Sequence, residues 1–148
     1  MAEITLAKTA GFCFGVNRAI RMVEELADSG KKVCTLGPII HNAQMVAQLE
    51  ARGVYAVDTP DEAPEDATLV IRSHGVEKEV RDAILASGRP CANATCPFVL
   101  KIHRLAAKAA DEGRDVLIAG DPEHPEVKGI LSHCGGRGLV FSDRKSVV

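Results

Sequence analysis

Short β-rich runs alternate with helical patterns along the chain, and this alternation limits the fold more than any other feature. The β-rich runs cover residues 4–9, 32–36, 54–57, 68–72, 90–92, 115–119 and 139–141. Strands that alternate with helices form parallel sheets, because each helix carries the chain back to the start of the next strand. The sequence therefore predicts an α/β fold of Rossmann-like αβα units with parallel sheets.

Four helices are expected between these runs. Apolar residues recur at helical spacing over residues 16–26, and Gly30 provides a stop signal. Asn42 is a suitable N-cap for a second helix. A third helix is expected over residues 77–87, and a fourth over residues 97–112 starts with a proline, which suits a first helical turn.

The repeated strand-loop-helix units predict one complete α/β domain over residues 1–93 and an incomplete second domain over residues 94–148. Ser142 and Asp143 resemble the start of a further helix, but residues 144–148 supply barely one turn. The chain is therefore expected to end inside an element.

Composition excludes several classes of function. The 148 residues include 46% hydrophobic side chains and carry a formal net charge of -2, without the basic excess that nucleic-acid or anionic-membrane binding needs. No apolar run approaches the roughly 20 residues of a membrane span. A cytoplasmic protein is expected, and its five cysteines are expected to be free thiols or metal-bound thiolates rather than disulfides.

Reactive side chains fall repeatedly in loops between a predicted strand and the next helix, and such loops gather at the ligand-binding edge of a parallel sheet. These side chains are Cys13, His41, His74, Cys96, His124 and Glu126. The three histidines each stand beside Gly, Pro or Asn near a helix start, where backbone N–H groups favour an anion such as a diphosphate. Glu126 is either a first-turn carboxylate or a proton donor.

The remaining cysteines and histidines have simpler interpretations. Cys34 and Cys91 lie in strand-like runs and are expected to be buried structural residues. Cys134 could join His133 in a metal site, but a thiol in a surface loop is the favoured interpretation. His103 and His133 are expected to be structural.

Five segments, in this order, resemble motifs of 4-hydroxy-3-methylbut-2-enyl diphosphate reductase, the last enzyme of the non-mevalonate isoprenoid pathway. The segments are GFCFGVNRAI from residue 11, LGPIIHN from residue 36, IRSHGV from residue 71, ATCPFV from residue 94 with Lys101 and His103, and HPEVKG from residue 124. Together they run through nearly the whole chain.

The resemblance implies an oxidoreductase with a four-iron four-sulfur (4Fe-4S) cluster, to which Cys13 and Cys96 would supply two of three cysteine ligands. It also implies diphosphate binding by His41, His74 and His124, with proton donation by Glu126. The reaction would be a reductive dehydroxylation to isopentenyl and dimethylallyl diphosphates. A ferredoxin or flavodoxin would serve as electron donor.

Some features depart from the family pattern. None of the remaining cysteines stands in a motif that matches the third cluster ligand, so the chain is expected to be an inactive amino-terminal fragment of the reductase. Asn93 stands where the family commonly has aspartate, and the run at residues 4–9 tends in the family to pack with the last domain. A homodimer that covers exposed domain surface is possible. The alternatives are a non-redox diphosphate- or metal-binding α/β module and a plain α/β scaffold.

Overall fold

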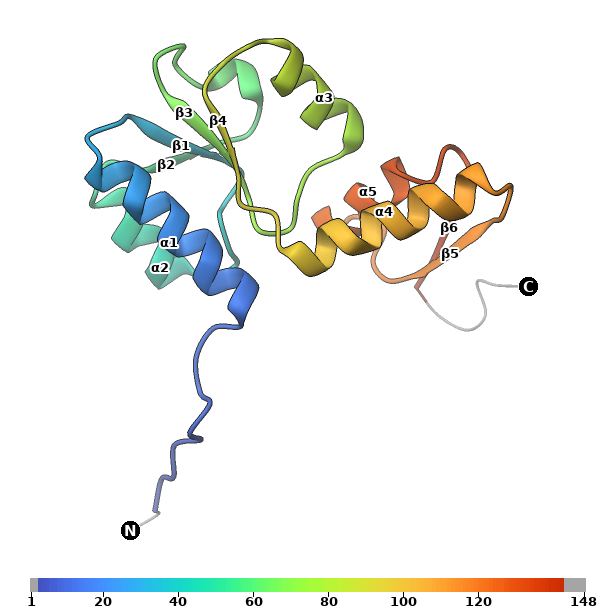
Figure 1. The fold of residues 1–148 in the computed structure, drawn as a ribbon. Helices are drawn as coiled ribbons and strands as arrows, with labels where there is room; N and C mark the ends of the chain where they lie inside the picture. The colour runs from blue at the N-terminus through green and yellow to red at the C-terminus, as the bar shows by residue number, and fades with distance from the viewer. Residues whose placement is uncertain (1–2, 143–148) are drawn as a thin grey trace.

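Residues 3–142 are described in the computed structural model, and they form two parallel sheets with helices around them (Figure 1). The first sheet has the strand order β2-β1-β3-β4. Its strands are β1 (Val33–Leu36), β2 (Tyr55–Val57), β3 (Thr68–Ile71) and β4 (Cys91–Asn93). The second sheet joins β5 (Val116–Ala119) to β6 (Gly138–Phe141). The predicted α/β fold with parallel sheets is confirmed.

Helices lie on both faces of the first sheet (Figure 1). They are α1 (Phe14–Asp28) and α2 (Ala43–Glu50) on one face and α3 (Lys78–Ala86) on the other. Successive residues of a strand point to opposite faces, so Val70 joins the cluster that contains Val23 of α1, whereas Leu69 and Ile71 join the cluster that contains Ile84 of α3. Burial on both faces explains the continuous apolar run of β3.

The second sheet carries both of its helices on one face (Figure 1). These helices are α4 (Pro97–Asp111) and α5 (Pro125–Ser132). The small core between helices and strands consists of Ala106, Ile118, Val127 and Cys134. Leu117 and Leu139 remain 59% and 60% exposed. We call β5, β6, α4 and α5 the second unit, and the four-stranded sheet with α1, α2 and α3 the first unit.

The helix starts and stops follow the local sequence signals. The Asn42 Oδ1 atom accepts a hydrogen bond of 2.9 Å from the backbone N–H of Met45, so Asn42 caps α2 as predicted. Gly30 follows α1 with a positive φ of 76°, a conformation that glycine adopts without strain. The expected connector at residues 59–66 contains a single 3-10 turn, η1 (Pro60–Glu62).

The strand predicted at residues 4–9 is wrong, because this segment has no strand structure and its side chains are exposed. Ile4 is 93% exposed and Leu6 is 82% exposed. A β-rich run becomes a strand only when it pairs with a neighbour, and no described strand pairs with this one. The helix predicted to start at Ser142 and Asp143 lies almost wholly outside the described residues. Within residues 3–142, no helix has the length and apolarity to cross a membrane.

Candidate functional site

Cys13 and Cys96 occupy equivalent positions, because each is the N-cap residue of a long helix. Cys13 precedes α1 and is exposed, and Cys96 precedes α4 and is half-buried. Neither side chain caps its helix by a hydrogen bond. The positive end of a helix dipole stabilises a thiolate, so both positions suit a metal-binding cysteine.

Gly15 brings the two helix starts together. A Cβ atom at Gly15 would lie 2.5 Å from the Cys96 Sγ atom and 3.1 Å from its Cβ atom, so the thiol fills the space that any larger residue would need. Gly15 lies in the first turn of α1, two residues after Cys13. The Cys96 sulfur therefore packs directly against the helix start that carries Cys13.

Hydrogen bonds hold the loop before Cys96 in place. Arg18 of α1 donates to the backbone oxygens of Thr95 at 3.4 Å and Asn93 at 3.5 Å. The Asn93 Oδ1 atom accepts from the Thr95 N–H at 2.9 Å, which is the acceptor role that an aspartate would also fill. The Cys96 N–H donates to the Ser73 oxygen at 2.9 Å.

The three histidines predicted to meet do so. The ring centroids lie 4.6 Å apart for His41 and His74, 6.0 Å apart for His41 and His124, and 5.8 Å apart for His74 and His124. His41 and His74 follow β1 and β3, which are neighbours in the sheet, and Ser73 ties their loops together through a 2.9 Å bond from its Oγ to the Ile39 oxygen. We call these three side chains the histidine cluster.

His124 is the N-cap residue of α5, and its orientation is fixed by its own helix. Its Nδ1 atom accepts a 3.2 Å hydrogen bond from the backbone N–H of Glu126. A neutral imidazole has one acceptor and one donor nitrogen, so Nε2 carries the hydrogen and can donate to an anion.

His74 is held neutral at physiological pH. Burial lowers the pKa of His74 to about 4, and the neighbouring His41, Arg72 and His124 add to this effect. Its Nδ1 atom is buried and has no hydrogen-bond partner among the described residues. A bound anion would supply that partner and would favour the protonated form.

Glu126 lies half-buried in the first turn of α5, two residues after His124. The structure therefore brings the six predicted site residues to the helix starts and loops at one end of the strands. Cys13 reaches this end through the start of α1, without the preceding strand that the sequence pattern predicted.

The favoured interpretation of Cys134 as a surface thiol is wrong. Its side chain is fully buried in the core of the second unit, and its Sγ donates to the Ile130 oxygen at 3.3 Å. Cys34 is also fully buried and Cys91 is half-buried, and burial raises the pKa of all three thiols. A raised pKa disfavours the thiolate, so these cysteines are structural.

Gly15 and Arg18 contribute to the site in a way that the pattern of reactive side chains did not identify. Glycines on both sides of Cys13 were a signal for close approach of another group, but the approaching group is the Cys96 sulfur of the same chain. Arg18 carried no signal in isolation, since an arginine on an amphipathic helix is usually solvated.

The cysteines at this end of the fold suit part of the implied iron-sulfur cluster. Thiolates are the ligands that such clusters prefer, and Cys13 and Cys96 are the two cysteines at this end of the described chain. Within residues 3–142, no three His, Cys, Asp or Glu side chains are grouped to hold a metal ion. The two cysteines fit as part of a cluster site that needs a further ligand.

The comparisons with known proteins agree on one family. A family model described as LytB protein matches residues 4–148. The chain is 46% identical over 145 residues to 4-hydroxy-3-methylbut-2-enyl diphosphate reductase of Geobacter sp. (strain M21), covering 98% of this chain and 51% of that relative. The enzyme of the same name from Aquifex aeolicus (strain VF5) is 43% identical, and the match covers 99% of this chain and 52% of that relative.

Solved structures give the same result. A structure of (E)-4-hydroxy-3-methyl-but-2-enyl diphosphate reductase matches with a TM-score of 0.83 at 40% identity and covers 99% of this chain and 53% of that one. A structure of E-1-hydroxy-2-methyl-but-2-enyl-4-diphosphate reductase from Plasmodium falciparum matches with a TM-score of 0.89 at 27% identity. This match covers 95% of this chain and 44% of that one. The chain thus spans about half the length of the relatives it matches. On the family match and these identities, the chain belongs to the LytB protein family.

Proposed function

We propose that this chain supplies one part of the active site of a 4-hydroxy-3-methylbut-2-enyl diphosphate reductase. The observation that carries the proposal is the histidine cluster, which lies at the same end of the fold as the two N-cap cysteines. Family membership and the names of the relatives support the reaction class.

In the proposed site the histidine cluster binds the substrate diphosphate. His124 donates from Nε2, because its Nδ1 is occupied by the Glu126 N–H. His74 takes up a proton as the anion binds, since the negative charge offsets the burial that lowers its pKa to about 4 in the free chain. Local histidines therefore hold the anion without a basic surface.

Cys13 and Cys96 would hold the 4Fe-4S cluster together with a third cysteine from outside this chain. When bound, the cluster supplies electron transfer and a position open to the substrate oxygen. Gly15 and Arg18 set the place of the Cys96 thiol through the contacts given above. Because a ligand is missing, the chain alone is expected to give no turnover.

Glu126 is proposed to donate the proton that lets the hydroxyl group leave. The reaction breaks the allylic C–O bond, and two electrons, delivered by a ferredoxin or flavodoxin donor, together with two protons yield water and the isopentenyl or dimethylallyl diphosphate. Glu126 stands two residues from His124, so a diphosphate held by the histidine cluster would place the carbon chain of the substrate near its carboxyl group.

We further propose that residues 1–93 form one domain and residues 94–148 the beginning of a second, since the two sheets are separate. A cytoplasmic location suits the proposed electron donors. A homodimer would cover apolar side chains such as Leu117 and Leu139, which are exposed in the second unit.

Inorganic pyrophosphate is a direct probe of the proposed anion site. Replacing His74 with alanine should weaken pyrophosphate binding by about tenfold, because a hydrogen bond to a charged group contributes about 1.5–3 kcal/mol. Isothermal titration calorimetry on the wild-type chain and the variant measures the change.

The matched control is Arg137→Ala, which removes a positive charge from the second unit, where Arg137 pairs with Asp115. Its affinity for pyrophosphate should equal that of the wild type. The anion site would be contradicted if His74→Ala and the wild type bound pyrophosphate equally well. It would also be contradicted if Arg137→Ala lost as much affinity as His74→Ala.

A further inference from the structure

The histidine cluster is assembled from two units that share no sheet. His41 and His74 belong to loops of the first unit, whereas His124 caps α5 of the second unit. The distance between His74 and His124 therefore depends on how α5 is seated against the first unit. The contacts between α3, α4, α5 and the His74 loop determine that seating.

His103 of α4 lies at the centre of these contacts. Its side chain is buried, with 4% of its surface exposed, and it stacks on His133 with ring centroids 4.3 Å apart and an interplanar angle of 19°. The Nε2 atom of His103 has no hydrogen-bond partner among the described residues. Packing rather than hydrogen bonding therefore defines the place of this ring.

Two glycines make room for the His103 ring, one from each unit. A Cβ atom at Gly75, the residue after His74, would lie 3.2 Å from the His103 Cε1 atom. A Cβ atom at Gly129, inside α5, would lie 3.2 Å from the His103 Nε2 atom. The ring is thus wedged between the loop that carries His74 and the helix that His124 caps.

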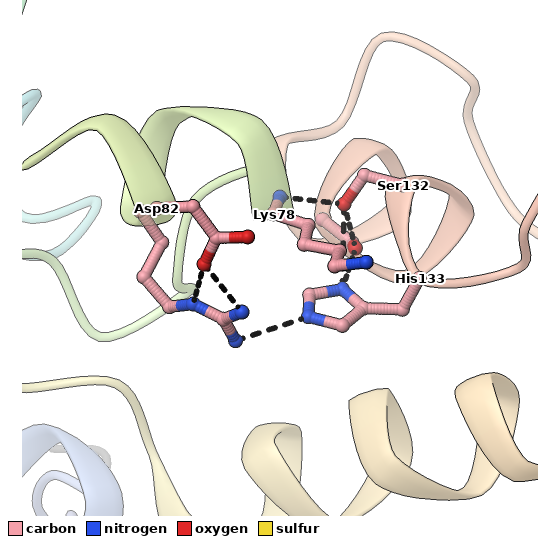
Figure 2. Close-up of polar contacts among 6 residues, drawn as sticks. Lys78, Asp82, Ser132 and His133 are labelled. Atoms are coloured by element: carbon pink, nitrogen blue, oxygen red, sulfur yellow. Dashed lines mark hydrogen bonds and ion pairs between the residues drawn. The ribbon is translucent and has the colours of Figure 1, made fainter. Parts of the chain in front are cut away.

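Hydrogen bonds hold the His133 ring in place, as Figure 2 shows. The His133 Nδ1 atom lies 2.8 Å from the Gly129 oxygen, and a carbonyl oxygen only accepts, so Nδ1 carries the hydrogen. The His133 Nε2 atom then accepts from Arg81 of α3 at 3.4 Å. Arg81 is itself held by a 2.7 Å ion pair with Asp82.

A second tie joins the same two helices. The backbone N–H of Lys78, at the start of α3, donates to the Ser132 Oγ atom at 2.9 Å, and that hydroxyl donates to the Gly129 oxygen at 2.7 Å (Figure 2). The first turn of α3 is therefore fastened to the last turn of α5, close to the stacked rings.

We propose that the stacked pair of His103 and His133, seated on Gly75 and Gly129, is a positioning joint that sets the distance between His124 and the other two histidines of the cluster. Neither His103 nor His133 needs to touch the ligand. The joint acts through the rigid connection from Gly129 along α5 to its N-cap. Its effect on ligand binding rests on the proposed function, whereas its effect on ring distances does not.

Two variants test the joint in the 148-residue chain. Gly129→Ala adds a methyl group against the His103 ring while alanine favours the helix more than glycine does. His133→Ala removes the stacking partner and the bond to Arg81. In both variants the nuclear Overhauser contacts between the His74 and His124 rings should weaken, and the pKa of His74 should rise from about 4 toward its ordinary value.

The contact between His41 and His74 should stay unchanged in both variants, because these residues belong to the same unit. Ile130→Val is the matched control, since Ile130 lies on α5 beside Gly129 but packs into the core of the second unit. Ile130→Val should leave the contacts among the His41, His74 and His124 rings as in the wild type. Unchanged contacts between His74 and His124 in both Gly129→Ala and His133→Ala would overturn the joint.

Pyrophosphate separates this inference from the proposed function. If the wild type binds pyrophosphate, both joint variants should bind it about tenfold more weakly, as expected for one displaced charge-assisted hydrogen bond. If the wild type does not bind it, the proposed function fails, while the ring contacts still decide whether the joint exists.

Discussion

A Gly15→Ala variant should displace the Cys96 thiol from the start of α1 and, with it, lose the ability to hold an iron-sulfur cluster. The added Cβ atom would lie 2.5 Å from the Cys96 Sγ atom, far inside the van der Waals contact distance of carbon and sulfur. The Cys96 Cβ atom, at 3.1 Å, leaves little room for a small adjustment. The thiol must therefore rotate away from the start of α1, or the two helix starts must separate.

The expected cost in stability is modest compared with the loss of cluster binding. Overpacking costs about 1–3 kcal/mol, so the variant should fold. Iron and sulfide content after anaerobic reconstitution, with an added small thiol as third ligand, measures the outcome. Val16→Ala, one residue along α1 and partly buried in the first core, is the matched control. Cluster content in Gly15→Ala equal to that of the control would contradict the proposed role of Gly15.

The free energy of unfolding should fall as the pH drops from about 6.5 toward about 4, because the buried His103 and the half-buried His74 are held in the neutral form. Burial lowers the pKa of His103 to about 4, with His133 and Arg81 adding to the effect, and burial also lowers the pKa of His74 to about 4. In the unfolded chain both groups bind a proton near their ordinary pKa of 6.5. The unfolded state therefore binds more protons in this window, and stability is lost as the pH falls.

The contribution of His103 is about 2–3 kcal/mol between neutral pH and a pH of about 4.5, on the scale of about 1.4 kcal/mol for each unit of pKa. Urea unfolding at several pH values measures it. Carboxylates whose pKa is lowered by hydrogen bonds, such as Glu62 and Asp66, also lose stabilisation as the pH falls through the acid end of this window, so the histidine contribution is read from the comparison variant. His103→Gln is the comparison variant and should show a shallower pH dependence. A wild-type chain whose stability stays constant across the window would contradict burial of neutral histidines.

The sequence predicted the helices and central strands well where periodicity and end signals agreed. The apolar spacing before Gly30 and the cap at Asn42 both identified real helices, because these signals depend on residues that are close in the chain. The strand predicted at residues 4–9 was wrong because a strand forms only with a pairing partner, and the local sequence does not show whether that partner is present. The position of Cys134 in a short Ser-His-Cys-Gly segment likewise gave no sign that β6 and α5 would bury it.

The approach of His41 to His74 was predictable, whereas the contacts that bring His124 to them and hold the site together were not. Loops that follow neighbouring parallel strands come to one edge of a sheet, so His41 and His74 had to be close. The contact of Gly15 with Cys96 and the wedge of His103 between two glycines depend on tertiary packing. Such close packing has no periodic signature in a single sequence.

Anaerobic reconstitution of the wild-type chain with iron, sulfide and a small thiol tests the proposed cluster site most directly. The wild type and Cys91→Ser should show the Mössbauer spectrum and visible charge-transfer absorption of a thiolate-ligated cluster, and Cys13→Ser and Cys96→Ser should lose both signals. The proposed cluster site would be contradicted if the cluster signals persisted in both Cys13→Ser and Cys96→Ser. It would also be contradicted if the wild type held no more iron than these two variants. Pyrophosphate binding in a chain that takes up no cluster would instead support a non-redox diphosphate-binding module.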